Sequence, residues 1–188
     1  MDYVLFLLLA FILANLFTPL VIQWAHKFKF LDIPRPPRNL HSHPVAKLGG
    51  LPVFAAVSIC VGFLWMTGGI DFAIIPQKFI IATFFGGLVL MIGGIIDDKY
   101  DLPSKYLWIF PVIASVIVVA SGVGVGIKEI SNPFGDPISL DFFWLGISGS
   151  GIFIFLWLVG MMFTTKFLDG LDGLVVGIGM IAGLTLFA

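Results

Sequence analysis

The chain has 188 residues, of which 59% are hydrophobic and 11% are charged, and its formal net charge is −1. Its mean hydropathy is +1.09. A soluble globular domain carries roughly 25% charged residues, so this composition excludes a water-soluble domain and predicts a membrane protein. The net charge gives no electrostatic basis for binding nucleic acid. The single cysteine, Cys60, lies in an apolar run and cannot form an intrachain disulfide.

Apolar runs of transmembrane character recur along the whole chain. They cover residues 3–24, 48–67, 78–96, 106–127, 142–163 and 173–188. A helix needs about 20 predominantly apolar residues to cross a bilayer, and most of these runs come close to that length. No basic residue precedes the first run, so we expect a retained helix there rather than a cleaved signal peptide. The sequence therefore predicts an all-α integral membrane protein with about six transmembrane helices.

The connections between these runs differ in charge, and the difference predicts the orientation of the chain. Cytoplasmic loops carry an excess of Lys and Arg. The first, third and fifth connections hold most of the basic residues, which are Lys27, Lys29, Arg35, Arg38, Lys47, Lys99, Lys105 and Lys166. We therefore expect the N-terminus outside and these three connections in the cytoplasm. The acidic fourth connection should form a small extracytoplasmic hairpin, in which residues 127–130 and 137–140 flank a turn at 132–136.

The third connection, residues 97–105, begins with two adjacent carboxylates, Asp97 and Asp98, and Asp101 follows. Charge at the mouth of a membrane helix is costly unless it is paired, hydrated or bound to a cation. Adjacent carboxylates repel each other, which favours a divalent metal or a proton at this position. The alternative is a hydrated loop in which Asp101 caps the next helix. The motif alone does not decide between the two interpretations.

A second acidic motif follows the fifth run, where Asp169 and Asp172 are each followed by glycine and Lys166 comes just before them. Carboxylates three positions apart lie on one face of a helical turn. The glycines remove side chains beside each carboxylate, so that a ligand or backbone can approach closely. The motif is therefore a candidate second acidic site, and a glycine-rich break between two spans with polar turn residues is the alternative.

The first connection is basic and contains Arg38, His41 and Lys47, together with the lone acid Asp32. Such side chains beside a membrane can hold a lipid phosphate or a nucleotide diphosphate. A positive-inside anchor explains the segment equally well, and Asp32 then pairs with a neighbouring Lys or Arg. The three motifs occupy odd-numbered connections, so we expect them to emerge on one face of the membrane, where they could form one site.

In these segments the chain resembles the polyprenyl-phosphate N-acetylhexosamine-1-phosphate transferases, the glycosyl transferase 4 family that includes the MraY and WecA enzymes. The resemblance rests on residues 32–34, 38–50, 94–102 and 167–174. It implies a phosphotransferase that moves a sugar-1-phosphate from a UDP-sugar to a polyprenyl phosphate, releases UMP and initiates cell-envelope polysaccharide synthesis. It also implies a requirement for Mg²⁺, with Mn²⁺ as the alternative. With Asp at position 101, the chain resembles the GlcNAc-type branch more closely, because the MurNAc-pentapeptide branch usually has Lys at that position.

The resemblance also implies a role for each candidate residue. Asp97 and Asp98 would be catalytic and would bind or activate the lipid phosphate near the metal. Asp98, Asp169 and Asp172 would ligate the metal. The expected substrate-binding residues are Asp32, Arg38, His41, Lys47, Asp101 and Lys166. The expected location is the inner (cytoplasmic) membrane with the active face in the cytoplasm, and a homodimer stays open.

Two features depart from the family pattern. The family usually has Asn where Lys166 stands, and a Lys there could pair with a carboxylate or a phosphate. The family also has more spans than this chain supplies, so we expect residues 1–188 to form one transmembrane catalytic-type domain truncated at its C-terminal end. Two other functions stay open. One is an inactive or partner-dependent fragment of such an enzyme, and the other is a cation or proton transporter that uses the same acids.

Overall fold

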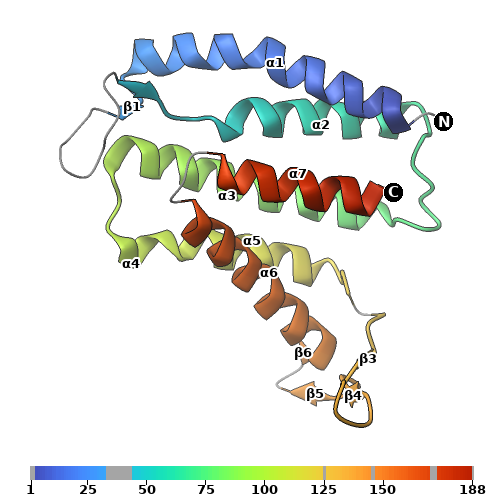
Figure 1. Ribbon diagram of the computed structural model, residues 1–188. Helices are drawn as coiled ribbons and strands as arrows, with labels where there is room; N and C mark the ends of the chain where they lie inside the picture. The colour runs from blue at the N-terminus through green and yellow to red at the C-terminus, as the bar shows by residue number, and fades with distance from the viewer. Residues whose placement is uncertain (1–2, 33–43, 125, 145–146, 170–172, 188) are drawn as a thin grey trace. The chain divides into compact units, whose positions relative to one another are not determined.

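The computed structural model describes the chain apart from residues 1–2, 33–43, 125, 145–146, 170–172 and 188 (Figure 1). The chain forms two compact units, Met1–Ile117 and Val118–Ala188. Almost all of the regular structure is helical, and each strand is only two residues long. The predicted all-α class is therefore confirmed, whereas the prediction of one domain stays a prediction.

The first unit consists of helices, with one short antiparallel ladder beside them. Its elements are α1 (Tyr3–Phe28), β1 (Leu31–Asp32), β2 (Val45–Ala46), α2 (Gly50–Met66), α3 (Gln77–Tyr100), α4 (Ser104–Leu107) and most of α5 (Ile109–Ala120). Helix α1 packs along α2, and α2 contacts α3. Figure 1 shows α1 and α2 side by side, with the β1 ladder at the end where α1 stops.

Two glycines on α3 allow aromatic rings to come close to its backbone. A Cβ atom at Gly87 would lie 2.7 Å from the ring of Phe54 on α2, and a Cβ at Gly93 would overlap the ring of Phe110 on α5. Small residues at such contacts are typical of membrane helices, because lipid gives no hydrophobic driving force between helices and close packing must supply the attraction. The two glycines therefore allow α3 to approach Phe54 of α2 and Phe110 of α5 closely.

The second unit has two short hairpins followed by two helices. Its elements are β3 (Glu129–Ile130), β4 (Ile138–Ser139), β5 (Phe143–Trp144), β6 (Ile147–Ser148), α6 (Gly149–Leu168) and α7 (Leu174–Phe187). Strands β3 and β4 pair antiparallel, with Glu129 opposite Ser139 and Ile130 opposite Ile138. The hairpin predicted for the fourth connection is therefore confirmed, and its extracytoplasmic location stays a prediction.

Within the described residues, six helices have the apolar character of membrane spans. Three are long and apolar enough to cross a bilayer, namely Val4–Phe28, Gln77–Tyr100 and Gly149–Leu168. Three shorter apolar helices cover Gly50–Met66, Lys105–Ala120 and Leu174–Leu186. Their large side chains face outward, as for Phe11, which is 64% exposed. Exposed apolar surface of this extent suits a lipid environment and is unusual for a soluble monomer. The chain is an all-α multi-pass membrane protein.

Two predicted helix boundaries are wrong around the third and fourth runs. The third run was expected to end at residue 96, but α3 continues to Tyr100. The fourth was expected to be continuous over residues 106–127, but it is interrupted at Trp108 and ends at Ala120. Gly122 and Gly124 follow with φ angles of 89° and 82°, a left-handed conformation that ends a helix.

The fifth predicted span begins too early. Residues from 142 onward are apolar, but β5 and β6 form a hairpin and α6 starts only at Gly149. The hydroxyl of Ser148 accepts the backbone N–H of Gly151 at 3.2 Å and caps the helix. Short runs rich in Phe, Trp and Ile suit a strand as well as a helix, so hydropathy alone could not locate this start.

Candidate functional site

A short ladder brings the basic first connection to the end of the helices. Helix α1 ends where Lys29 takes a left-handed conformation with φ 61°. The chain then enters β1, which pairs with β2 so that Leu31 lies opposite Ala46 and Asp32 opposite Val45. Just beyond the ladder, the backbone N–H of Lys47 donates to the carbonyl of Phe30 at 3.0 Å. Lys47 is therefore fixed at its backbone.

The acidic third connection begins inside a helix. Asp97 and Asp98 lie in the last turn of α3, and Asp101 is its C-cap with φ 46° and ψ 63°. The backbone N–H of Asp101 donates to the carbonyl of Asp97 at 2.8 Å. The backbone N–H of Leu102 donates to Asp97 Oδ1 at 3.2 Å. The predicted loop over residues 97–105 is thus wrong in its first part, and Asp101 ends α3 instead of capping the next helix.

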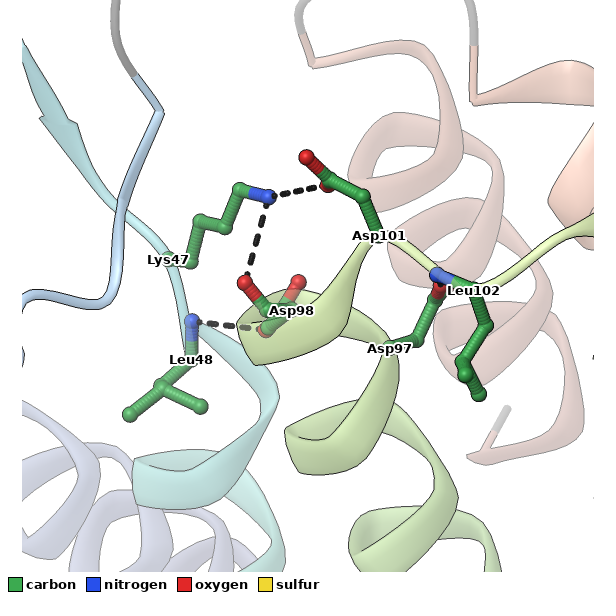
Figure 2. Close-up of polar contacts among 6 residues, drawn as sticks. All are labelled: Lys47, Leu48, Asp97, Asp98, Asp101 and Leu102. Carbon is green, nitrogen blue, oxygen red and sulfur yellow. Dashed lines mark hydrogen bonds and ion pairs between the residues drawn. The ribbon is translucent and has the colours of Figure 1, made fainter.

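These two segments meet, although they are 50 or more positions apart in the sequence. The ammonium Nζ of Lys47 lies 3.2 Å from Asp101 Oδ1 and 3.3 Å from the backbone carbonyl oxygen of Asp98. The backbone N–H of Leu48 donates to Asp98 Oδ2 at 3.2 Å. Figure 2 shows these contacts at the end of α3. We call Lys47, Leu48, Asp97, Asp98 and Asp101 the α3-end cluster.

The α3-end cluster is rich in carboxylates. It holds three carboxylates, and Asp101 forms an ion pair with the ammonium of Lys47. The carbonyl end of a helix also favours a cation, which explains why Lys47 points at the Asp98 carbonyl. The Asp98 carboxylate lies beside the start of α2, where the positive end of the helix dipole stabilises an anion.

The cluster offers the oxygen chemistry that Mg²⁺ prefers. Asp98 uses Oδ2 for the Leu48 N–H, and within the described part of the chain its Oδ1 accepts no hydrogen bond. The described residues contain no group of three or more His, Cys, Asp or Glu placed to hold a metal ion by themselves. Magnesium commonly takes only one or two carboxylates and completes its shell with water and substrate phosphates. The carboxylates of the α3-end cluster are therefore of the chemical type that would hold a magnesium ion.

The other candidate residues lie elsewhere in the chain. Arg38, His41 and Asp172 lie outside the described residues. Asp32 lies in β1, within the first unit. Lys166 is in the last turn of α6 and Asp169 is the C-cap of that helix, both in the second unit. The structure brings together Lys47, Asp97, Asp98 and Asp101, while their convergence with Asp169 and Asp172 stays a prediction.

One contact of the site had no signal in the sequence. Leu48 contributes its backbone N–H to Asp98 and has a φ of 70°, although it is not a glycine. Backbone donors carry no residue signature, and a left-handed leucine is not predicted by any propensity. Residues of this kind are found only once the fold is known.

Taken together, the fold and the cluster define a class of protein. The chain is a multi-pass membrane protein that gathers carboxylates and a lysine from two connections at the end of one apolar helix. The model of Glycosyl transferase family 4 matches residues 80–188, which include both acidic motifs. The chain belongs to this family.

Curated relatives agree with this assignment. The chain is 27% identical over 164 residues to the "Probable undecaprenyl-phosphate N-acetylglucosaminyl 1-phosphate transferase" of Bacillus subtilis, a match that covers 87% of the chain and 41% of the relative. It is 28% identical over 161 residues to the decaprenyl-phosphate N-acetylglucosaminephosphotransferase of Mycobacterium tuberculosis, covering 79% and 36%. A phospho-N-acetylmuramoyl-pentapeptide-transferase of Listeria monocytogenes is 30% identical over 190 residues, covering 92% and 54%.

The chain thus spans about two fifths to one half of the length of these relatives. No solved structure matches it.

Proposed function

We propose that the chain carries part of the active site of a membrane phosphoglycosyl transferase. The enzyme moves a HexNAc-1-phosphate from a UDP-sugar to a polyprenyl phosphate, and GlcNAc-1-phosphate is the donor group that the relatives' names favour. The observation that carries the proposal is the meeting of Lys47 with Asp98 and Asp101 at the end of α3, in a chain of this family.

The reaction is a phosphoryl transfer between two phosphates. An oxygen of the lipid phosphate attacks the β-phosphorus of the UDP-sugar, the bond from that phosphorus to the bridging oxygen breaks, and UMP leaves. The attacking oxygen is already ionised near neutral pH, so the protein needs to supply little general base catalysis. Alignment of the phosphates and stabilisation of their charge supply most of the rate in such transfers.

The chain's own residues supply alignment and charge. Lys47 holds a phosphate through its ammonium, which the Asp98 carbonyl keeps at the end of α3. Asp98 stays oriented by the Leu48 N–H, and Asp97 by the Leu102 N–H. A bound Mg²⁺ would neutralise the charge that develops on the phosphates. Asp98, Asp169 and Asp172 would hold it.

The remaining roles concern substrate binding. Arg38 and His41 contact a phosphate or the nucleotide, and Lys166 contacts a donor phosphate. Asp32 and Asp101 complete the polar surroundings of the substrates. These assignments require the odd-numbered connections to lie on the cytoplasmic face of the inner membrane, where UDP-sugars are available. The charge distribution of the connections supports that orientation.

The transporter alternative receives no support from the described helices. A transporter needs carboxylates near the middle of a span, facing a water-filled path. Asp97 and Asp98 instead lie in the terminal turn of α3, and the described parts of α1, α2, α5 and α7 contain no acidic residue.

A chimaera tests the proposal. This chain replaces the matching segment of the Bacillus subtilis relative, and membranes containing the chimaera receive [β-³²P]UDP-GlcNAc, Mg²⁺ and undecaprenyl phosphate. We expect radiolabelled lipid from the chimaera and from its Asp71→Asn variant. Asp71 is a suitable control because its Oδ1 accepts the Ala73 N–H in the loop before α3, away from the cluster. We expect none from Asp98→Asn, with insertion unchanged.

A binding measurement complements the chimaera. Native mass spectrometry of the chain in lipid nanodiscs should detect bound undecaprenyl phosphate, and Lys47→Met should weaken that binding. Equal labelling by the Asp98→Asn chimaera, or equal lipid binding by Lys47→Met, would remove the α3-end cluster from the active site.

A further inference from the structure

The partner of the Lys47 ammonium in this structure is a carboxylate of the protein itself. We propose that Asp101 acts as an internal anion. Its carboxylate pairs with the Lys47 ammonium until a substrate phosphate displaces it. The inference rests on the proposed function, in which Lys47 holds a phosphate. It adds that Asp101 competes with that phosphate for the Lys47 ammonium.

Lys47 is held in a way that leaves only its ammonium end able to change partner. The backbone on either side is fixed by the Lys47 N–H to the Phe30 carbonyl at 3.0 Å and by the Leu48 N–H to Asp98 Oδ2 at 3.2 Å. Nζ also donates to the Asp98 carbonyl at 3.3 Å, at the end of α3 that favours a cation. None of these contacts involves Asp101, so all of them persist when Asp101 leaves.

Asp101 is the more exposed partner in its ion pair with Lys47. The left-handed backbone at Asp101 folds its carboxylate back over the end of α3. Its side chain is 72% exposed, whereas that of Lys47 is 22% exposed. An ion pair with one partner this exposed contributes little to stability and exchanges readily.

The N–H donors of Lys47 also favour replacement of Asp101 by a phosphate. An ammonium has three N–H donors, and within the described part of the chain two of them are used, by the Asp98 carbonyl and by Asp101. A phosphate offers more charge and more acceptor oxygens than a carboxylate does. Two anions beside one ammonium repel each other, so phosphate binding is opposed by Asp101 for as long as the carboxylate stays.

The test removes the carboxylate while keeping its backbone. Asn and Gly both adopt the left-handed conformation, so Asp101→Asn and Asp101→Gly should preserve the C-cap of α3. Undecaprenyl phosphate is titrated into the full chain in nanodiscs at fixed Mg²⁺ and low salt. We expect both variants to bind it about two- to fivefold more tightly than the unchanged chain, the range that an exposed ion pair allows. Asp71→Asn serves as the matched control and should leave the affinity unchanged.

A second measurement follows Lys47 directly. Reductive methylation with ¹³C-formaldehyde, read by NMR, reports how accessible the ammonium is. We expect faster methylation of Lys47 in Asp101→Asn without ligand, and protection by undecaprenyl phosphate in both proteins.

The outcomes separate this inference from the proposed function. Tighter binding by both Asp101 variants, lost again on Lys47→Met, supports the internal anion. Unchanged or weaker binding by the Asp101 variants, with binding still dependent on Lys47, overturns the internal anion and leaves the proposed function standing. Binding that does not depend on Lys47 in any variant overturns both.

Discussion

The carboxylate of Asp98 should stabilise the fold as well as serve the reaction, and two substitutions separate these effects. Its Oδ2 accepts the Leu48 N–H at 3.2 Å, in a half-buried position beside the start of α2. Asp98→Ala leaves that N–H without its acceptor, which costs about 1–3 kcal/mol for a buried donor. Asp98→Asn keeps a carbonyl acceptor of the same size and also relieves repulsion from Asp97 and Asp101. We expect it to cost less than about 1 kcal/mol.

The assay compares unfolding in mixed detergent with transfer by the chimaera. Both substitutions should abolish transfer, but only Asp98→Ala should lower the free energy of unfolding clearly. An Asn variant that is destabilised as much as the Ala variant, or an Ala variant of unchanged stability, would refute the role given to the Leu48 hydrogen bond.

Three further predictions concern packing and binding. Gly93→Ala should destabilise the protein by about 1–3 kcal/mol, because the added Cβ would overlap an aromatic ring of α5. Gly94→Ala should be neutral or slightly stabilising, because its Cβ would meet open space. Thermal unfolding in detergent compares the two variants. Gly124→Ala should destabilise the protein by a similar amount, because its φ is 82° and a Cβ would lie 2.5 Å from a side chain of α6. Gly126→Ala should change the free energy of unfolding by no more than about 0.5 kcal/mol in the same assay. Lys47→Met in the chimaera should raise the KM for undecaprenyl phosphate by about tenfold or more, and an unchanged KM would contradict its phosphate-binding role.

The sequence predicted the membrane character and the motif residues better than it predicted their local structure. Hydropathy located six apolar helices because lipid imposes a simple length and composition rule. The β3–β4 hairpin was predictable, since residues 132–136 carry strong turn signals between two short apolar segments. Lys47 and Asp98 were both candidate site residues before the fold was known.

The predicted helix boundaries were wrong where an apolar run and the helical hydrogen bonds of the backbone end at different residues. Asp97 and Asp98 interrupt the apolar run, so residues 97–105 were expected to be a loop, yet the helical hydrogen bonds of α3 continue to Tyr100. The pairing of Lys47 with Asp101 joins positions 54 apart, and the β1–β2 ladder that brings them together has only two residues in each strand. Neither feature has a periodicity that a single sequence can reveal.

The account depends most on the odd-numbered connections sharing one membrane face, and cysteine labelling tests this directly. In a Cys60→Ala background, a membrane-impermeant maleimide is applied from either side to single-cysteine variants at four exposed positions. These positions are Tyr100, Phe167, Ile74 and Phe134, which are 66%, 83%, 77% and 96% exposed. We predict that positions 100 and 167 react from the cytoplasmic side and positions 74 and 134 from the opposite side. Labelling of positions 100 and 167 from opposite sides of the membrane would contradict the account.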